Sequence, residues 1–161
     1  MEKTIAEKLK VEMPYKWKIQ GYNKKGDKAQ CVAYIDARDL MDRLDEVMGI
    51  QNWRDSYRRD NSGRLICTLE LKFNDEWIAK EDTGTEGNYE KEKSEFSDAF
   101  KRAGVKWGIG RFLYDMDIQW LDVKEVQEGE RKVKRLYDGN VLVKSYQLTE
   151  YLNNKLKSKK D

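Results

Sequence analysis

The segment from residue 53 to residue 83 most constrains the fold, because it combines an alternating apolar run with a turn on each side. In RLICTLELKF, every second residue from Leu65 to Phe73 is apolar, which is the period of a strand with one buried face. Asn-Ser-Gly at 61–63 precedes the run and Asn-Asp at 74–75 follows it, and these residues favour tight turns. We therefore predict an antiparallel meander of three strands, at about residues 53–59, 64–73 and 76–82.

A long amphipathic helix is predicted after the meander, over about residues 89–108. Its apolar residues recur at spacings of three and four, so they form one stripe that can pack on the meander. The stripe consists of Phe96, Ala99, Phe100, Ala103 and Trp107. A meander followed by a long helix packed on it predicts an α+β fold.

The rest of the chain is predicted as strands and shorter helices around this core. A short helix is expected around Ile5 and Leu9, then strands at about 15–20 and 30–35. The next helix should begin after an N-cap at Asp36 and end at Gly49. We expect one or two strands within 118–143 and a peripheral helix from about residue 146.

Length and charge predict a single domain with no obvious partner. A chain of 161 residues can bury a core without metal or disulfides, and we predict one domain over 1–154, best supported over 15–116, with a basic tail at 155–161. The 32 basic residues nearly cancel the 30 acidic ones. The tail holds four lysines and one aspartate, a charge of +3, so the formal net charge of +2 leaves residues 1–154 near −1. Any affinity for nucleic acid must therefore come from clustering.

The residue inventory excludes several kinds of active site. Cys31 and Cys67 are the only cysteines and there is no histidine, so neither a Cys/His zinc site nor a Ser-His or Cys-His nucleophile can form. We expect two buried thiols, no metal and no cofactor. No apolar run is long enough to span a bilayer, and MEKTIAEKLK lacks the apolar core of a signal peptide. We expect no membrane partner and a cytoplasmic location, in a bacterial cell or a phage-infected host.

One interpretation of the meander is a magnesium-dependent nuclease. Glu70 and Lys72 lie two apart on a strand, and Asp55 or Asp60 belongs to the strand before it. Carboxylates that hold magnesium beside a lysine that supports the attacking water would suit that chemistry. Charged residues alternating with leucine also describe the solvent side of any antiparallel strand. A protein-interaction module without catalysis is a further alternative.

Basic residues stand near aromatic residues in three places, as expected of a surface that holds single-stranded nucleic acid. A charged face opposite an apolar stripe is also typical of plain solvent exposure, and Trp17, Trp53, Trp77 and Trp107 fit a core role better than a stacking role. The candidate contacts are Lys16 and Lys18 on the first strand, Tyr34 and Arg38 around the end of the second, and Lys91, Lys93, Lys101 and Arg102 on the long helix.

Two stretches resemble the Rad-fifty-two-type family of single-strand annealing proteins, in particular its bacterial DdrA-like and phage Sak-like branches. They are AYIDARDLMDRLDEVMGIQNWRDSY and WIAKEDTGTEGNYEKEKSEFSDAFKRAGVKWGIGRFLY, and the resemblance covers about residues 15–116. Its motifs are a Tyr-Ile-Asp start to the first long helix, a Gly-x-x-x-Trp exit at Gly49 and Trp53, and the Ser-Asp-x-x-Lys-Arg-Ala segment at 97–103.

The resemblance implies an antiparallel β-β-β-α core, with the long helix packed on a curved meander, that assembles into a homo-oligomeric ring or ring-like assembly. Such an assembly binds single-stranded DNA in a basic groove and anneals complementary strands in recombination and repair, without nucleotide hydrolysis. It assigns inner-strand contacts to Lys101, Arg102 and Tyr34, another to Lys16 or Lys18, and an outer contact to Lys93. A single-strand-binding protein or an exonuclease is a further expected partner. Where several members carry an arginine a turn after the Lys-Arg pair, this chain has Val105.

Overall fold

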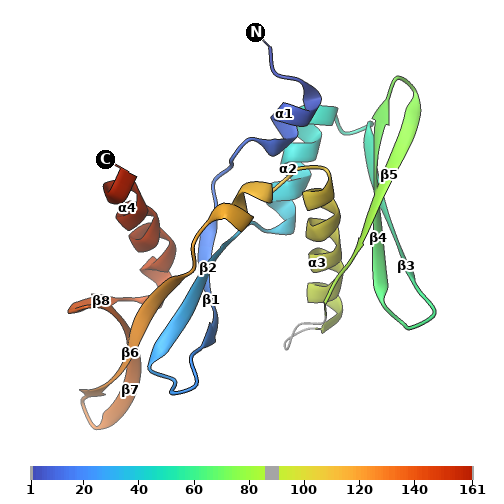
Figure 1. Ribbon diagram of the computed structural model, residues 1–161. Coiled ribbons are helices and arrows are strands. Elements are labelled where there is room, and N and C mark those ends of the chain that lie inside the picture. The colour runs from blue at the N-terminus through green and yellow to red at the C-terminus, as the bar shows by residue number, and fades with distance from the viewer. Residues whose placement is uncertain (1, 86–90, 161) are drawn as a thin grey trace. The chain divides into compact units, whose positions relative to one another are not determined.

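Figure 1 shows the computed structural model of the chain, which describes residues 2–85 and 91–160, apart from the side chains of 91–93 and 160. The chain divides into two units, and each is described here by itself. The first unit contains residues 1–14 and 35–115, and the second contains residues 15–34 and 116–161. One domain over 1–154, followed by a basic tail at 155–161, stays a prediction.

The first unit contains the predicted meander. Strands β3 (Trp53–Arg59), β4 (Leu65–Phe73) and β5 (Glu76–Thr83) pair antiparallel in that order. Asn74 and Asp75 adopt positive φ angles of 49° and 68° in the second turn, as Asn and Asp tolerate better than most residues. The sequence prediction of three strands and two tight turns is therefore confirmed.

Helix α3 (Lys91–Lys106) packs on β4 and β5 through the predicted stripe. Ala99, Phe100 and Ala103 are buried, as are the alternate residues of β4 that face them, Leu65, Cys67, Leu69 and Leu71. Phe96 departs from the prediction, since it remains 40% exposed at the edge of the seam, with its ring 5.0 Å from that of Tyr57. Trp107 lies just past the helix and donates its indole N–H to the Leu69 carbonyl at 3.0 Å.

Helices α1 (Ile5–Lys10) and α2 (Ala37–Met48) complete the packing of this unit. The predicted N-cap Asp36 accepts from the Asp39 backbone N–H at 3.0 Å, and the Asp39 carboxylate accepts from Asp36 in return. The buried Arg43 guanidinium donates to the carbonyls of Lys8, Leu9 and Val11, and so ties the end of α1 to α2. A 3-10 helix, η1 (Arg111–Asp115), ends the unit.

The second unit is a five-stranded antiparallel sheet in the order β1-β2-β6-β7-β8. The pairing of β2 with β6 joins residues about 90 positions apart, such as Gln30 and Trp120, and no local pattern in the sequence predicts it. One or two strands are predicted after residue 118, whereas the structure has three. The strands are β1 (Lys16–Tyr22), β2 (Lys28–Tyr34), β6 (Gln119–Glu128), β7 (Arg131–Asp138) and β8 (Val141–Val143).

Helix α4 (Leu148–Lys160), which follows the short 3-10 helix η2 (Ser145–Gln147), covers one face of this sheet. Trp17 is buried beneath it, donating its backbone N–H to the Thr149 hydroxyl at 3.0 Å and its indole N–H to Asn153 at 2.8 Å. The helix continues through the residues predicted as a basic tail, and Lys155 bonds Asp138 at 2.8 Å. The buried core of the unit is Trp17, Ala29, Cys31, Leu121, Leu136, Val143, Leu148 and Leu152.

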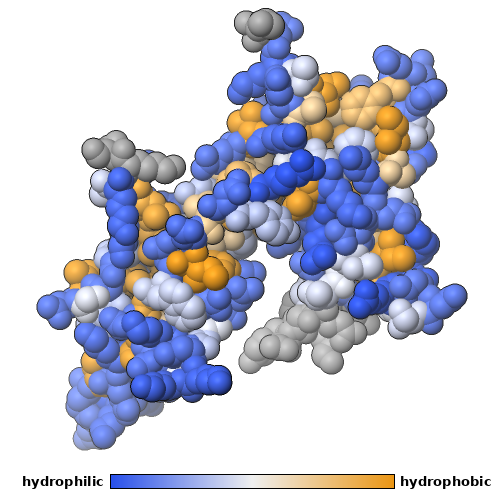
Figure 2. Space-filling model, viewed as in Figure 1, coloured by the Kyte–Doolittle hydropathy of each residue, from blue (hydrophilic) through white to orange (hydrophobic). Residues whose placement is uncertain are grey.

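Hydrophilic residues cover most of the surface that Figure 2 shows, on both units. None of the helices in the described part of the chain combines the length and the apolarity that a membrane crossing requires.

Candidate nucleic-acid interface

Lys101 and Arg102 are neighbours on α3, but their side chains lie in different surroundings because successive residues of a helix point about 100° apart. Lys101 is half-buried and donates its ammonium to the Ile35 carbonyl, 3.3 Å away, just before α2 begins. Gly104, one turn along α3, allows this close approach, since a β-carbon there would lie 2.6 Å from Leu40 Cδ1. The two cations are predicted from the sequence as a pair of DNA contacts, but in the fold Lys101 bonds a backbone carbonyl and Arg102 is exposed.

Arg102 lies on the side of α3 that faces β5. Its Nε is 3.5 Å from Asp82 Oδ1, and its side chain remains 46% exposed. An exposed ion pair of this length contributes little to stability, at most about 1 kcal/mol. The guanidinium therefore retains open donors that can bind a phosphate.

For the other candidate contacts of the first unit, Arg38, Lys91 and Lys93, the structure gives only the position on a helix. Arg38 is exposed in the first turn of α2. Lys91 and Lys93 belong to the first turn of α3, but their side chains lie outside the described residues.

In the second unit, Lys16, Lys18 and Tyr34 come together on one face of the sheet. Lys16 is the cross-strand partner of Tyr34, and the Lys18 ammonium lies 4.9 Å from the centroid of the Tyr34 ring. Both lysines are exposed, whereas Trp17 between them points into the core. The alternation in YKWKIQ predicts that the two lysines share one face of their strand, and the contact between Lys18 and Tyr34 follows from the pairing of β1 with β2.

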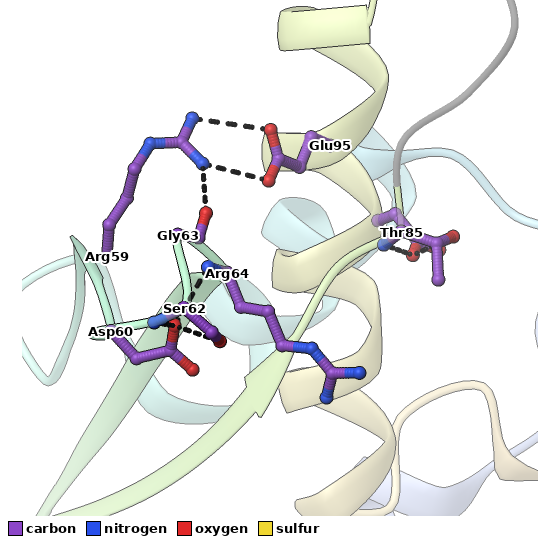
Figure 3. A network of polar contacts seen from close by, with 8 residues as sticks. Arg59, Asp60, Ser62, Gly63, Arg64, Thr85 and Glu95 are labelled. Carbon is purple, nitrogen blue, oxygen red and sulfur yellow. Dashed lines mark hydrogen bonds and ion pairs between the residues drawn. The ribbon is translucent and has the colours of Figure 1, made fainter.

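Arg64 is not among the contacts predicted from the sequence, and it shares a pocket of about 470 Å³ with Arg102. Arg64 follows the turn between β3 and β4, and Figure 3 shows its side chain extending away from that turn. Among the described residues, no carboxylate lies within ion-pair distance of its guanidinium. An arginine directly after Asn-Ser-Gly is exposed by its position, but nothing local in the sequence indicates that Arg102 lies across the pocket.

Hydrogen bonds hold the turn at this pocket (Figure 3). Asp60 accepts from the Ser62 hydroxyl at 2.8 Å and from the Arg64 backbone N–H at 2.9 Å, and these bonds lower the pKa of its carboxyl. Arg59 donates to both oxygens of the buried Glu95, at 3.1 and 3.3 Å, and to the Gly63 carbonyl. The turn that presents Arg64 is thus anchored to α3, which presents Arg102.

Gly84 and Thr85, which follow β5 and line this pocket, pass very close to α3. A β-carbon on Gly84 would lie 2.3 Å from the Glu95 carbonyl oxygen and 2.8 Å from the Ala99 nitrogen. Thr85 then donates its backbone N–H to Asp98 at 2.8 Å. Only glycine allows the end of the meander to pass α3 at this distance.

The meander does not assemble the carboxylates that the nuclease interpretation requires. Asp55 pairs with Leu69 and so faces α3, whereas Glu70 lies on the opposite face of β4. The Glu70 carboxylate accepts from Arg54 at 2.7 and 3.3 Å, which lowers its pKa. Within the described ranges, no group of three acidic or cysteine residues is placed to hold a metal ion.

Both cysteines are buried and unpaired, as predicted. Burial raises the pKa of Cys31 and of Cys67 to about 11, so neither thiol is ionised near neutral pH. They act as small core residues.

The tryptophans predicted for the core are divided between core and surface. Trp17 is buried, and Trp53 packs with its ring 6.0 Å from that of Phe100. Trp77 instead pairs with Lys72 on the face of the meander opposite α3, where the Arg54 guanidinium lies 4.1 Å from its ring. The core prediction for Trp77 is therefore wrong, because the side chains of β5 alternate between two faces.

Comparison with known proteins gives consistent matches. The model of the Rad52/22 family of double-strand break repair proteins matches residues 65–132. The single-stranded DNA-binding protein DdrA of Deinococcus radiodurans is 34% identical over 123 residues, which are 74% of this chain and 58% of that protein. The protein of the same name from Deinococcus deserti is 36% identical over 108 residues, 65% of this chain and 52% of that protein. The chain thus spans somewhat more than half the length of these relatives.

Proposed function

Because the model of the Rad52/22 family of double-strand break repair proteins matches residues 65–132 and two DdrA proteins are 34% and 36% identical, we propose that the chain belongs to this family, binds single-stranded DNA and anneals complementary strands without nucleotide hydrolysis. The two matched relatives are named single-stranded DNA-binding proteins. The structural observation that carries the proposal is the exposed pair Lys16 and Lys18 beside Tyr34 on β1 and β2. A cation row next to an aromatic ring suits a strand whose phosphates and bases are both accessible.

The proposed DNA contacts lie on both units. In the second unit they are Lys16, Lys18 and Tyr34. In the first unit Arg102 is the stronger contact of the helix pair, because its guanidinium is exposed while Lys101 already donates to a backbone carbonyl. Arg64 joins Arg102 through their shared pocket. Lys91, Lys93 and Arg38 remain proposed contacts on the strength of the sequence.

Annealing would follow from binding geometry and mass action. Cations that contact phosphates carry no base preference, so any sequence can be held. A bound strand with accessible bases offers them to a complementary strand, and pairing needs no covalent step. The chain then has to bind an extended stretch of DNA, which favours several copies acting together.

We propose that copies of the chain associate into a ring or ring-like oligomer. Strands β3 and β5 are the edges of the meander, and neither has an outer partner strand among the described residues. Edge strands of this kind can pair with another copy. Light scattering at micromolar concentration tests this, and a monomeric mass would refute it.

A cytoplasmic site of action, in a bacterial cell or a phage-infected host, also belongs to the proposal. A single-strand-binding protein or an exonuclease would be the natural additional partner, since each handles single-stranded DNA before it is annealed.

The decisive experiment follows the pairing of complementary labelled oligonucleotides with and without the protein, in EDTA and then in magnesium, with no nucleotide added. Faster pairing in EDTA supports metal-independent and nucleotide-independent annealing. Failure to bind or pair the oligonucleotides would refute the proposal. Strand cleavage in magnesium that disappears in Glu70→Gln would instead support the nuclease alternative.

A further inference from the structure

One face of the five-stranded sheet is covered by α4, and the opposite face has no element of the second unit packed on it in the described part of the chain. We call this second surface the open face. Side chains alternate along each strand, and directly opposed residues share a face, so the register assigns its members. Its members include Lys16, Lys18, Lys28, Gln30, Val32, Tyr34, Trp120, Asp122, Lys124, Glu128, Arg135 and Tyr137.

The open face carries three aromatic rings, and two of them are covered by a lysine. The Lys18 ammonium lies 4.9 Å from the centroid of the Tyr34 ring, and the Lys124 ammonium lies 4.9 Å from that of Tyr137. Trp120 lies on β6 opposite Gln30 and is 47% exposed. Among the described residues no cation lies over its indole and no other ring stacks on it.

Trp120 lies between two lysines on the open face. Lys18 lies two strands away, about 10 Å across the sheet, and Lys124 lies four residues along β6, about 13 Å away. A large indole held in water between two lysines is a surface on which a planar, uncharged ring can stack while charged groups beside it meet the lysines.

We propose that Trp120 is a base-stacking contact for single-stranded DNA on the open face. This inference rests on the proposed function and adds to it, because the cationic contacts proposed above bind the backbone and the Tyr34 ring is covered by Lys18. The residue would hold one base against the sheet while Lys18 and Lys124 bind flanking phosphates. The strand would then run from Lys18 on β1 to Trp120 and on along β6 to Lys124.

The charge of the open face favours nucleic acid over a protein partner. Its two acidic residues are already neutralised, since Asp122 lies 3.6 Å from Lys28 and Glu128 is paired with Arg135. The lysines that cover the tyrosines therefore leave the face positive. A polyanion that also offers flat rings complements both features.

The test compares the affinity of the full chain for two oligonucleotides of equal charge. One is a fluorescent oligothymidine, and the other is an abasic oligonucleotide of the same length. Trp120→Ala should weaken oligothymidine binding roughly 5- to 100-fold, the range for losing one stacked base, with an unchanged salt dependence. Its affinity for the abasic strand should stay within about twofold of wild type, since phosphate contacts remain.

Two further variants make the result specific. Trp120→Phe should recover most of the loss, because a smaller ring still stacks. Tyr146→Ala is the matched control, since Tyr146 is a 78% exposed aromatic residue of the same unit that lies outside the strands. It should bind both ligands like wild type.

The outcomes separate this inference from the proposed function. Wild-type affinity of Trp120→Ala for oligothymidine would overturn the inference, as would equal losses for both ligands. If Trp120→Ala fails to fold, the intrinsic tryptophan fluorescence of wild type and of Trp120→Phe is compared, and the difference between them is the emission of Trp120. If unlabelled oligothymidine does not quench that emission, the inference is overturned. Wild-type protein that binds neither ligand would overturn the proposed function itself.

Discussion

At the scale of single residues, the same type of side chain serves different purposes according to burial. Arg43 is buried and donates from Nη1 to three carbonyls, whereas Arg102 is half-exposed with one long ion pair. Burial keeps the first away from a ligand, and exposure leaves donors of the second accessible. Counting cations along the sequence cannot separate these two cases.

Arg102→Ala should weaken single-stranded DNA binding and reduce the slope of log affinity against log salt by about 0.7, because one phosphate contact is lost. The free energy of unfolding should change by at most about 1 kcal/mol, since the ion pair to Asp82 is exposed. Fluorescence anisotropy at several salt concentrations measures the slope. Lys8→Ala removes an equal charge from α1 as a control, and equal slopes for the two variants would remove Arg102 from the interface.

Arg43→Met should lower the free energy of unfolding by about 2–4 kcal/mol, because it leaves carbonyls near the end of α1 without their donor. Arg38→Met, an exposed substitution on the same helix, should change it by less than about 0.5 kcal/mol. Urea unfolding of both variants provides the comparison. Similar losses in the two would show that the buried guanidinium does not anchor α1.

At the scale of elements, the seam between α3 and the meander depends on small residues as well as on the apolar stripe. Ala99, Ala103 and Gly104 bring the helix close to its neighbours, and Gly84 lets β5 pass it. The periodicity of α3 predicted the burial of Ala99, Phe100 and Ala103, but not the exposure of Phe96. How closely the backbones approach was set by the packed structure.

Gly84→Ala should destabilise the protein by about 1–3 kcal/mol, because its methyl group would overlap the backbone of Glu95 and Ala99, which cannot rotate away. Gly21→Ala is the control, since the nearest atom to its β-carbon would be Gln30 Oε1 at 3.8 Å. That variant should remain within about 0.5 kcal/mol of wild type. Thermal or urea unfolding measures both, and an unchanged midpoint for Gly84→Ala would contradict the close approach.

The outer face of the meander should be sensitive to acid through Glu81. Hydrogen bonds from Arg58 and Thr68 lower the pKa of this carboxyl from 4.5 to about 2. Because the folded-state value lies below the unfolded one, the stabilisation is present above about pH 4.5 and is lost as the pH falls towards 2. The side chains are partly exposed, which limits the contribution to about 1 kcal/mol.

Glu81→Gln therefore should be less stable than wild type at pH 6, and the difference should shrink as the pH is lowered to 2.5. Urea unfolding at the two pH values measures it. A difference that stays constant with pH would show that the Arg58 contact does not stabilise the ionised carboxylate.

At the scale of the whole molecule, the distribution of charged residues over the surface matters more for binding DNA than the net charge. With 32 basic and 30 acidic residues the net charge is small, yet most acids that lie near the candidate surfaces are paired. The second unit is built from two segments that flank the first in the sequence. Its sheet, and therefore the open face, exists only after residues 116–161 pair with residues 15–34.

The sequence by itself determined the local elements of this protein. Turn residues at 61–63 and 74–75, the period of two in β4, the spacing of the α3 stripe and the cap at Asp36 all act between near neighbours, so their conformational preferences can be read directly. The shared exposed face of Lys16 and Lys18 follows from the same alternation.

Only the tertiary structure decided which distant groups meet. It paired β2 with β6, faced Arg64 towards the pocket of Arg102, engaged Lys101 with a carbonyl of Ile35 and left Trp120 on an uncovered face. These contacts join residues separated by up to about 90 positions, and their energy comes from the burial and pairing of whole elements. No local preference in the sequence encodes that choice, because it is made by the packing of all the elements together.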